Sequence, residues 1–151
     1  MNGNDWMDVV TVVLEQHEAA EYSLREVAEA SPDARADRFR SLTLLLSEHE
    51  AAEENVVYPA LRKLGPAGTA LADVLATEEA AAKAALKSLG TMEPTSPEFA
   101  ERFADLMGAV LQHADNERAS VLPLLQTSFT DQERRAMGDA FLAAQHHRPT
   151  E

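Results

Sequence analysis

Four segments of the chain carry apolar residues at alternating steps of three and four, and His or Glu interrupts each of these stripes near its middle. Steps of three and four keep side chains on one face of an α-helix, so the stripes predict helices that pack against one another. The stripes are Val10, Val13, His17, Ala20, Leu24 and Val27; Phe39, Leu42, Leu46, His49, Glu53, Val56 and Ala60; Ala72, Leu75, Glu79, Ala82, Leu86 and Leu89; and Phe99, Phe103, Leu106, Val110, His113, Glu117, Ser120 and Leu124.

Prolines, glycines and capping residues mark the ends of these helices. The signals are Ser31-Pro32, Gly65-Pro66, Ser96-Pro97 and a capping box formed by Thr130 and Glu133. We therefore expect an all-α, up-and-down antiparallel four-helix bundle with a short fifth C-terminal helix, in one domain over residues 1–151. The expected helices span about residues 6–29, 32–63, 69–89 and 97–126, which form the bundle (6–126), and about 131–147.

Charge and cysteine content exclude several classes of protein. The chain has 26 acidic and 13 basic residues and a formal charge of -13, so we expect neither nucleic acid nor an anionic membrane as a partner. It contains no Cys, so a metal site would have to use His and carboxylate side chains. No apolar run is long enough to span a membrane, and the N-terminal MNGNDWMD is acidic where a secretory signal is basic, which predicts a cytoplasmic protein.

The ionisable residues inside the stripes form the candidate functional site. Burying His or Glu costs several kcal/mol per charge without a compensating partner, and the mid-helix positions of a bundle converge on its core. A shared metal centre would provide that partner. Three imidazoles and three carboxylates suit two ions, about 3.5 to 4 Å apart, better than one ion. The predicted metal ligands are His17, His49, Glu53, Glu79, His113 and Glu117.

An internal repeat supports this set of residues. The pattern His-x3-Glu-x5-Pro starts at His49 and again at His113, and its i,i+4 spacing places His and Glu on one helical face. The same relation maps His17 onto the third helix at about residues 79 to 81. Glu79 keeps the phase of that helix's stripe, and we prefer it to Glu78, which would need a shifted phase.

The order of these motifs resembles the hemerythrin-like, or HHE cation-binding, family over about residues 7 to 126. The matching features are His17, His-x3-Glu followed by Tyr58-Pro59, and the second His-x3-Glu. The resemblance implies a non-heme di-iron centre that meets O2, peroxide or NO, with His17, His49, Glu53, His113 and Glu117 as ligands. We therefore expect two iron ions with an oxo or hydroxo bridge as the cofactor.

The third helix departs from that family. Oxygen-carrying hemerythrins have two histidines there, whereas LATEEAAAKAAL has none. A carboxylate in place of an imidazole stabilises ferric over ferrous iron. We therefore expect redox turnover or sensing, including peroxide- or NO-directed oxidoreductase activity, rather than reversible O2 carriage.

Two alternative functions were weighed. A ferritin-like iron oxidase or store would use Glu-x-x-His, but the residues three positions before the three histidines of the site are Leu14, Leu46 and Val110. An interaction module with a purely structural metal stays open, and we expect a monomer or weak homodimer.

The remaining polar residues receive minor roles. We expect Tyr58 to pack away from the metals, because it lies nine residues, or about 180°, beyond His49; a kink at Pro59 is the alternative that would turn it inward. His146 and His147 are given no role. Solvated faces are expected for Glu18, Glu21, Glu48, Glu50 and Glu54, of which Glu21 is the one candidate to support His17.

Overall fold

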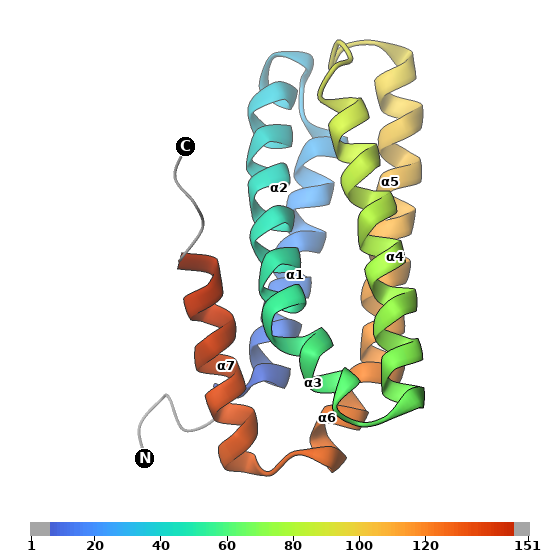
Figure 1. Cartoon of the computed structure of the whole chain (residues 1–151). Coiled ribbons are helices and arrows are strands. Elements are labelled where there is room, and N and C mark those ends of the chain that lie inside the picture. Colours follow the sequence, from blue (N-terminus) through green and yellow to red (C-terminus); the bar gives the residue numbers. More distant parts are fainter. Residues whose placement is uncertain (1–6, 147–151) are drawn as a thin grey trace.

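The structure, a computed structural model, describes residues 7–146, and its elements are all helical (Figure 1), which confirms the all-α prediction. The α-helices are α1 (Val9–Glu29), α2 (Pro32–Ala52), α3 (Tyr58–Arg62), α4 (Pro66–Leu89), α5 (Pro97–Asn116), α6 (Leu122–Ser128) and α7 (Asp131–His146). Two π-helical segments, η2 (Glu53–Val57) and η3 (Glu117–Val121), connect α2 to α3 and α5 to α6. None of the helices in this range has the length and apolar character of a membrane span.

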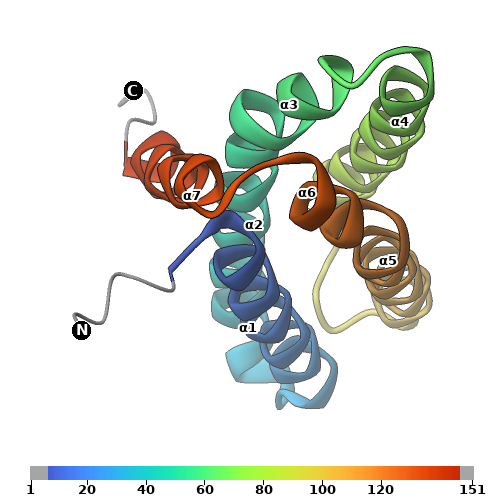
Figure 2. The ribbon, with the colours of Figure 1, turned by 90° about the horizontal axis from the view of Figure 1, so that it is seen from below.

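The long helices α1, α2, α4 and α5 lie side by side (Figure 1). α1 packs against α2 and α4 against α5, so the bundle consists of two helix pairs. The view from below shows α7 outside these pairs, next to the α1–α2 side (Figure 2). α7 contacts both α1 and α2, so the C-terminal helix packs against the outside of that pair.

Two of the predicted capping signals form hydrogen bonds at helix starts, whereas Ser31 precedes α2 without a side-chain cap bond. The Ser96 hydroxyl accepts a hydrogen bond from the Phe99 N–H at 3.1 Å, and the Thr130–Glu133 capping box closes with bonds of 2.8 and 3.1 Å. α4 begins at Pro66 rather than at about residue 69. Gly65, with φ of 97°, adopts a left-handed conformation open to glycine and lets the chain enter α4 at once.

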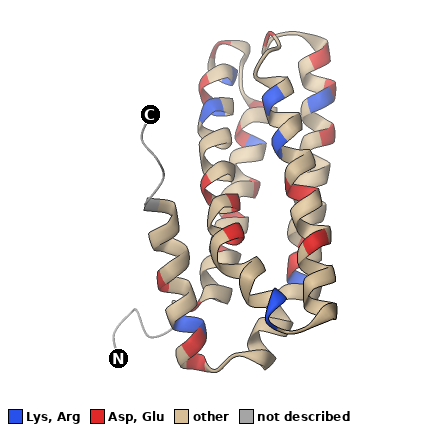
Figure 3. Ribbon diagram, viewed as in Figure 1, with Lys and Arg blue, Asp and Glu red and all other residues tan. Residues whose placement is uncertain are grey.

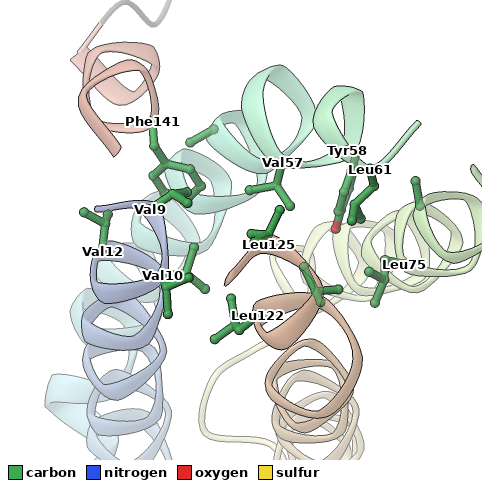
Figure 4. Packing of buried hydrophobic residues seen from close by; sticks show 14 residues of the cluster. Val9, Val10, Val12, Val57, Tyr58, Leu61, Leu75, Leu122, Leu125 and Phe141 are labelled. Atoms are coloured by element: carbon green, nitrogen blue, oxygen red, sulfur yellow. The ribbon is translucent and has the colours of Figure 1, made fainter. Parts of the chain in front are cut away.

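Buried apolar residues form two clusters, one toward each end of the bundle. The lower cluster includes Val9 to Val13 of α1 and Leu75 of α4, and Figure 4 shows it in detail. The upper cluster includes Leu24 of α1 and Leu86 of α4. Along every long helix, the His or Glu of the predicted stripe lies in sequence between the two clusters. The core therefore has a polar layer near its middle.

The two π-helical segments correct the predicted stripes. Each begins at the Glu of a His-x3-Glu motif, and its closing hydrogen bonds run from Tyr58 N–H to the Glu53 carbonyl and from Leu122 N–H to the Glu117 carbonyl. A π-turn absorbs one extra residue, so every later position moves by one. The buried residues are therefore Val57, Val121 and Leu125, where the stripes predicted Val56, Ser120 and Leu124.

Proline explains why the helices widen at these two places. Pro59 and Pro123 have no N–H to donate, and a proline ring crowds the carbonyl four residues earlier in a regular α-helix. Both prolines follow a π-helical segment by two residues. A wider turn before the proline relieves this crowding, so the repeated sequence produces a repeated break in helical phase.

Replacing Gly138 by Ala should lower the free energy of unfolding by about 1–3 kcal/mol. A Cβ at this position of α7 would lie 2.6 Å from the Met7 carbonyl oxygen and 3.0 Å from the Val9 nitrogen, and backbone has little room to move. Denaturant unfolding measures the effect. Gly108→Ala is the control, because a Cβ there meets nothing within 4 Å and alanine favours a helix; equal losses in both variants would contradict the close packing of α7.

Candidate metal centre

The polar layer brings together all six residues that the sequence analysis selected. Five of them are buried, and His113 is partly buried. Their ligand atoms form two groups in which all atoms lie within 4.8 Å of one another. One group is His17, His49, Glu53 and Glu117, and the other is Glu53, Glu79, His113 and Glu117. Because Glu53 and Glu117 belong to both groups, the arrangement has the form of two adjoining sites with two shared carboxylates.

The imidazoles direct ring nitrogens at these carboxylates. His17 Nε2 lies 2.8 Å from Glu117 Oε1, and His49 Nε2 lies 3.2 Å from Glu53 Oε2. His113 Nε2 faces three carboxylates, at 3.4 Å from Glu117, 3.5 Å from Glu79 and 3.8 Å from Glu53. Cationic charge placed among these atoms would be surrounded by donors from all four long helices and from the two π-helical segments.

Burial and the neighbouring side chains shift the pKa values of several residues in the cluster. Burial lowers the pKa of His49 to about 4, which keeps its imidazole neutral and able to bind a metal at neutral pH. Burial and the nearby Glu117 raise the pKa of Glu53 well above its ordinary value. Burial also opposes ionisation of Glu117, but interactions with the nearby Glu53, His113 and His17 outweigh it and lower its pKa. Burial and close contact therefore shift the pKa values of the two shared carboxyl groups in opposite directions.

Unpartnered polar atoms test whether a metal fits these residues. Six buried atoms of the cluster have no hydrogen-bond partner among the described residues, namely His17 Nδ1, His49 Nε2, His113 Nε2, Glu53 Oε2, Glu79 Oε1 and Glu117 Oε2. A buried polar atom without a partner costs about 1–3 kcal/mol, so such a concentration calls for a missing partner. Imidazole nitrogens and carboxylate oxygens suit a first-row transition metal, and the donor set fits.

Two residues contact the Nδ1 atoms of His49 and His113, and the sequence analysis did not predict these contacts. His49 Nδ1 lies 2.8 Å from Gln16 Oε1, and His113 Nδ1 lies 2.8 Å from Glu78 Oε1. A hydrogen bond at Nδ1 fixes the ring and leaves Nε2 free for a metal. Each partner directly precedes a member of the cluster in sequence, His17 or Glu79. This adjacency, combined with the internal repeat, is the sequence feature from which the two contacts could have been predicted.

Two glutamates behave differently from the expectation. Glu21 does not support His17 by a hydrogen bond in the described structure; it pairs with Arg25 on an exposed turn of α1. Glu50, expected on a solvated face, is buried with 6% of its surface exposed, and its Oε1 has no hydrogen-bond partner within residues 7–146. Burial, with repulsion from Glu79, raises the pKa of Glu50 to about 7. The sequence analysis gave His146 and His147 no role. The side chain of His146 and the whole of His147 lie outside the described residues.

Tyr58 points into the cluster, contrary to the preferred expectation that it packs away. Its hydroxyl lies 2.6 Å from Glu79 Oε2, to which it donates, and 3.3 Å from Glu53 Oε1. The extra residue in η2 reduces the turn from Glu53 to Tyr58 to about 40° of ideal helix. The π-turn, rather than a kink at Pro59 itself, brings the phenol to the site. Figure 4 shows Tyr58 beside Leu61 in the lower cluster.

Replacing Tyr58 by Phe should lower the free energy of unfolding by about 1–3 kcal/mol, because the buried Glu79 loses its donor. Denaturant unfolding of the purified protein measures the change. Tyr22, with 66% of its surface exposed, provides the matched control, and its replacement by Phe should change stability by less than about 0.5 kcal/mol. Equal effects of the two substitutions would show that the Tyr58 hydroxyl contributes nothing to the cluster.

A small cavity reaches the cluster from the upper half of the bundle. Its lining combines apolar side chains with His17, Glu21, His49, Glu50, Glu78, Glu79 and His113. About 40 Å³ of it is open to the centre of a water-sized molecule, and one buried water needs roughly 10–15 Å³ of such space. The cavity therefore has room for a molecule of two to four atoms beside the cluster.

A helical bundle around a buried His and carboxylate cluster that could hold metal ions defines the general class of this protein. The family described as hemerythrin HHE cation binding domain matches residues 8–125, and the chain belongs to that family. α7 lies beyond the matched region.

Similar proteins extend this comparison. The fold is similar to the crystal structure of a hemerythrin HHE cation binding domain-containing protein from Mycobacterium kansasii, with a TM-score of 0.81 and 24% identity over 92% of this chain and 85% of that chain. An uncharacterized hemerythrin-like protein of Schizosaccharomyces pombe is 28% identical over 70% of this chain and 52% of its own length. A Nostoc protein named DNA nickase is 23% identical over 91% of this chain and 39% of its own length. The chain thus spans about half or less of the curated relatives it matches.

Proposed function

We propose that the chain is a non-heme di-iron protein, an up-and-down antiparallel four-helix bundle that binds two iron ions and reacts with O2, peroxide or NO. The observation that carries this proposal is the pair of ligand groups that share Glu53 and Glu117. In this proposal His17 and His49 would hold one ion, Glu79 and His113 would hold the other, and Glu53 and Glu117 would be available to both. Iron bound there would supply electron transfer to or from a small oxygen or nitrogen species.

The surrounding residues prepare the site for that chemistry. Gln16 and Glu78 orient two of the imidazoles through Nδ1, and the apolar clusters above and below keep bulk water away. The Tyr58 hydroxyl holds a proton 2.6 Å from Glu79 Oε2. The cavity of about 40 Å³ supports a reactant as small as O2, H2O2 or NO.

The buried Glu79 favours redox turnover or sensing over reversible O2 carriage. An anionic oxygen donor stabilises ferric iron more than a neutral imidazole does. A site with this bias gives up electrons readily and returns to the ferrous state less readily, which suits peroxide- or NO-directed oxidoreductase activity. A cytoplasmic location and a monomeric or weakly dimeric state remain part of the proposal.

The activity named for the Nostoc relative is not extended to this chain. The chain corresponds to 39% of that protein, and its formal charge of -13 repels a polyanion. Figure 3 shows acidic residues along the long helices among few basic ones. A basic surface for DNA binding is not part of the proposed function.

Metal analysis with a visible spectrum tests the proposed cofactor. We expect about two iron ions per chain and near-ultraviolet charge-transfer absorption, as oxygen-bridged ferric pairs show, because six donors converge on two adjoining groups. One zinc ion per chain and a featureless spectrum would contradict it.

Reaction of the reduced protein with O2, H2O2 and NO in separate anaerobic mixing experiments then tests the reactivity. One diferrous centre supplies only two electrons, so reduction of many reactant molecules per site in the presence of an excess of added chemical reductant supports turnover. A fully occupied centre that reacts with none of the three would favour a structural metal in an interaction module.

A further inference from the structure

We propose that Gln16 and Glu78 make the two metal positions unequal, so that the position at Glu79 and His113 takes the first metal ion and the position at His17 and His49 the second. The inference rests on the two-metal site proposed above and adds an order of binding to it. Gln16 and Glu78 are positioning residues in this scheme, because each acts through the histidine that it contacts.

His49 and His113 have matching contacts at their outer ring nitrogens. Gln16 Oε1 and Glu78 Oε1 each lie 2.8 Å from the Nδ1 of a histidine on another helix. Those histidines, His49 and His113, begin the two copies of His-x3-Glu, and each copy continues into a π-helical segment at its Glu. The internal repeat therefore extends to the residues that contact Nδ1 of these two histidines.

The chemistry differs at both related positions, and in the same direction. The partner of His49 Nδ1 is the amide oxygen of Gln16, whereas the partner of His113 Nδ1 is a carboxylate oxygen of Glu78. A carboxylate at Nδ1 makes the imidazole a more basic ligand than an amide oxygen does. In the cluster itself, the imidazole of His17 corresponds to the carboxylate side chain of Glu79. The half that contains His113 thus has two additional carboxylates near its cation, while Glu53 and Glu117 serve both halves.

Additional side chains hold both Nδ1 partners in place. Gln16 and Gln145 of α7 form a reciprocal pair, with N–H to oxygen distances of 2.9 and 2.8 Å. The Gln16 oxygen, which accepts a hydrogen bond from Gln145 Nε2, also faces His49 Nδ1. On the other side, Glu78 Oε2 accepts from Asn116 Nδ2 at 3.1 Å while Oε1 contacts His113. Neither partner needs to reorient when a metal ion arrives.

Titration of the metal-stripped protein with Zn²⁺ alone tests the order. The nitrogen resonances of the histidine rings, recorded by long-range proton–nitrogen NMR, report which ring binds at each step. We expect the first equivalent to shift His113 Nε2 and the second to shift the rings of His17 and His49. Competition with a chelator gives the two affinities.

Two substitutions exchange the amide and the carboxylate that contact Nδ1 of His49 and His113. Glu78→Gln should weaken the first binding step by about 10- to 100-fold while two ions still bind. Gln16→Glu should strengthen the second step, and the variant with both changes should bring the two affinities together or reverse their order. Glu18→Gln removes the same charge from an exposed position of α1 and should leave both affinities unchanged.

The outcomes separate this inference from the function on which it rests. Two ions that bind together, or His17 and His49 first, would overturn the order and leave the two-metal site intact. An effect of Glu78→Gln no larger than that of Glu18→Gln would likewise overturn the inference. Fewer than two Zn²⁺ per wild-type chain would contradict the two-metal site itself, and the order would fall with it.

Discussion

Removing both metal ions from the purified protein should lower the midpoint of thermal unfolding by on the order of 15–30 °C. A ligand that binds the native state alone adds about 4 kcal/mol of stability when its free concentration is a thousand times its Kd, so two ions add about 8 kcal/mol. For a chain of this size, each kcal/mol corresponds to about 2–4 °C.

The physical origin of this loss lies in the polar layer. Without cations, Glu53, Glu79 and Glu117 face one another in the core, and they must repel or take up protons. Scanning calorimetry of the metal-loaded, chelated and reloaded protein measures the effect. Reloading should restore the midpoint, and the same chelator should leave the midpoint of Glu53→Ala unchanged. Equal midpoints for the loaded and chelated wild type would show that the cluster does not bind metal as part of the fold.

The sequence predicted the location of the polar layer well because helical phase is preserved up to it. His17, His49 and Glu79 lie on regular α-helices, so steps of three and four place them correctly on the inner face. Glu53 and Glu117 begin the π-helical segments and still keep the phase of the helix before them. All six stripe residues therefore converge, and the two ligand groups follow from packing four such helices around one core.

Beyond Glu53 and Glu117 the same reasoning loses its accuracy. A period of 3.6 residues cannot represent a turn that absorbs an additional one, so the stripes misplace Val56, Ser120 and Leu124 by one position, although Ala60 is buried as predicted. Tyr58 shows the consequence, since its expected direction was away from the cluster and its hydroxyl contacts Glu79. Pro59 and Pro123, at the same distance from the two motifs, were the sequence signal for a repeated break in the helix.

Residues beside the stripes were harder to assign because their roles depend on neighbouring helices. Gln16 and Glu78 lie one position from an inward-facing residue, where a side chain can turn toward solvent or toward an adjacent helix. The positions of His49 and His113 decide between these directions. The contribution of Gln145 adds a helix that packs from outside the bundle, which a pattern within one helix cannot reveal. Glu50 was misassigned for the same reason, since its burial arises from tertiary packing.

Replacing Glu53 by Ala should abolish both metal positions, whereas replacing Glu79 by Ala should abolish one. Glu53 belongs to both ligand groups, and its loss removes a shared carboxylate from each; Glu79 belongs to one group. We expect about two ions per chain for the wild type, none retained in Glu53→Ala and one in Glu79→Ala after loading with iron under anaerobic conditions and desalting. Metal analysis measures the retained ions, and the circular dichroism of each variant confirms that the helices have formed.

Neighbouring glutamates supply the controls that give this comparison its meaning. Glu54 follows Glu53 in sequence but is exposed and lies 3.9 Å from Lys83, so Glu54→Ala should retain two ions. Glu78→Ala should also retain two, with weaker binding at His113, because Glu78 contacts that ring and not the cluster. Glu53→Gln keeps the side-chain volume and should lose metal as Glu53→Ala does. If Glu53→Ala lost one ion only, Glu53 would belong to a single position, and the shared-carboxylate arrangement on which the di-iron proposal depends would be wrong.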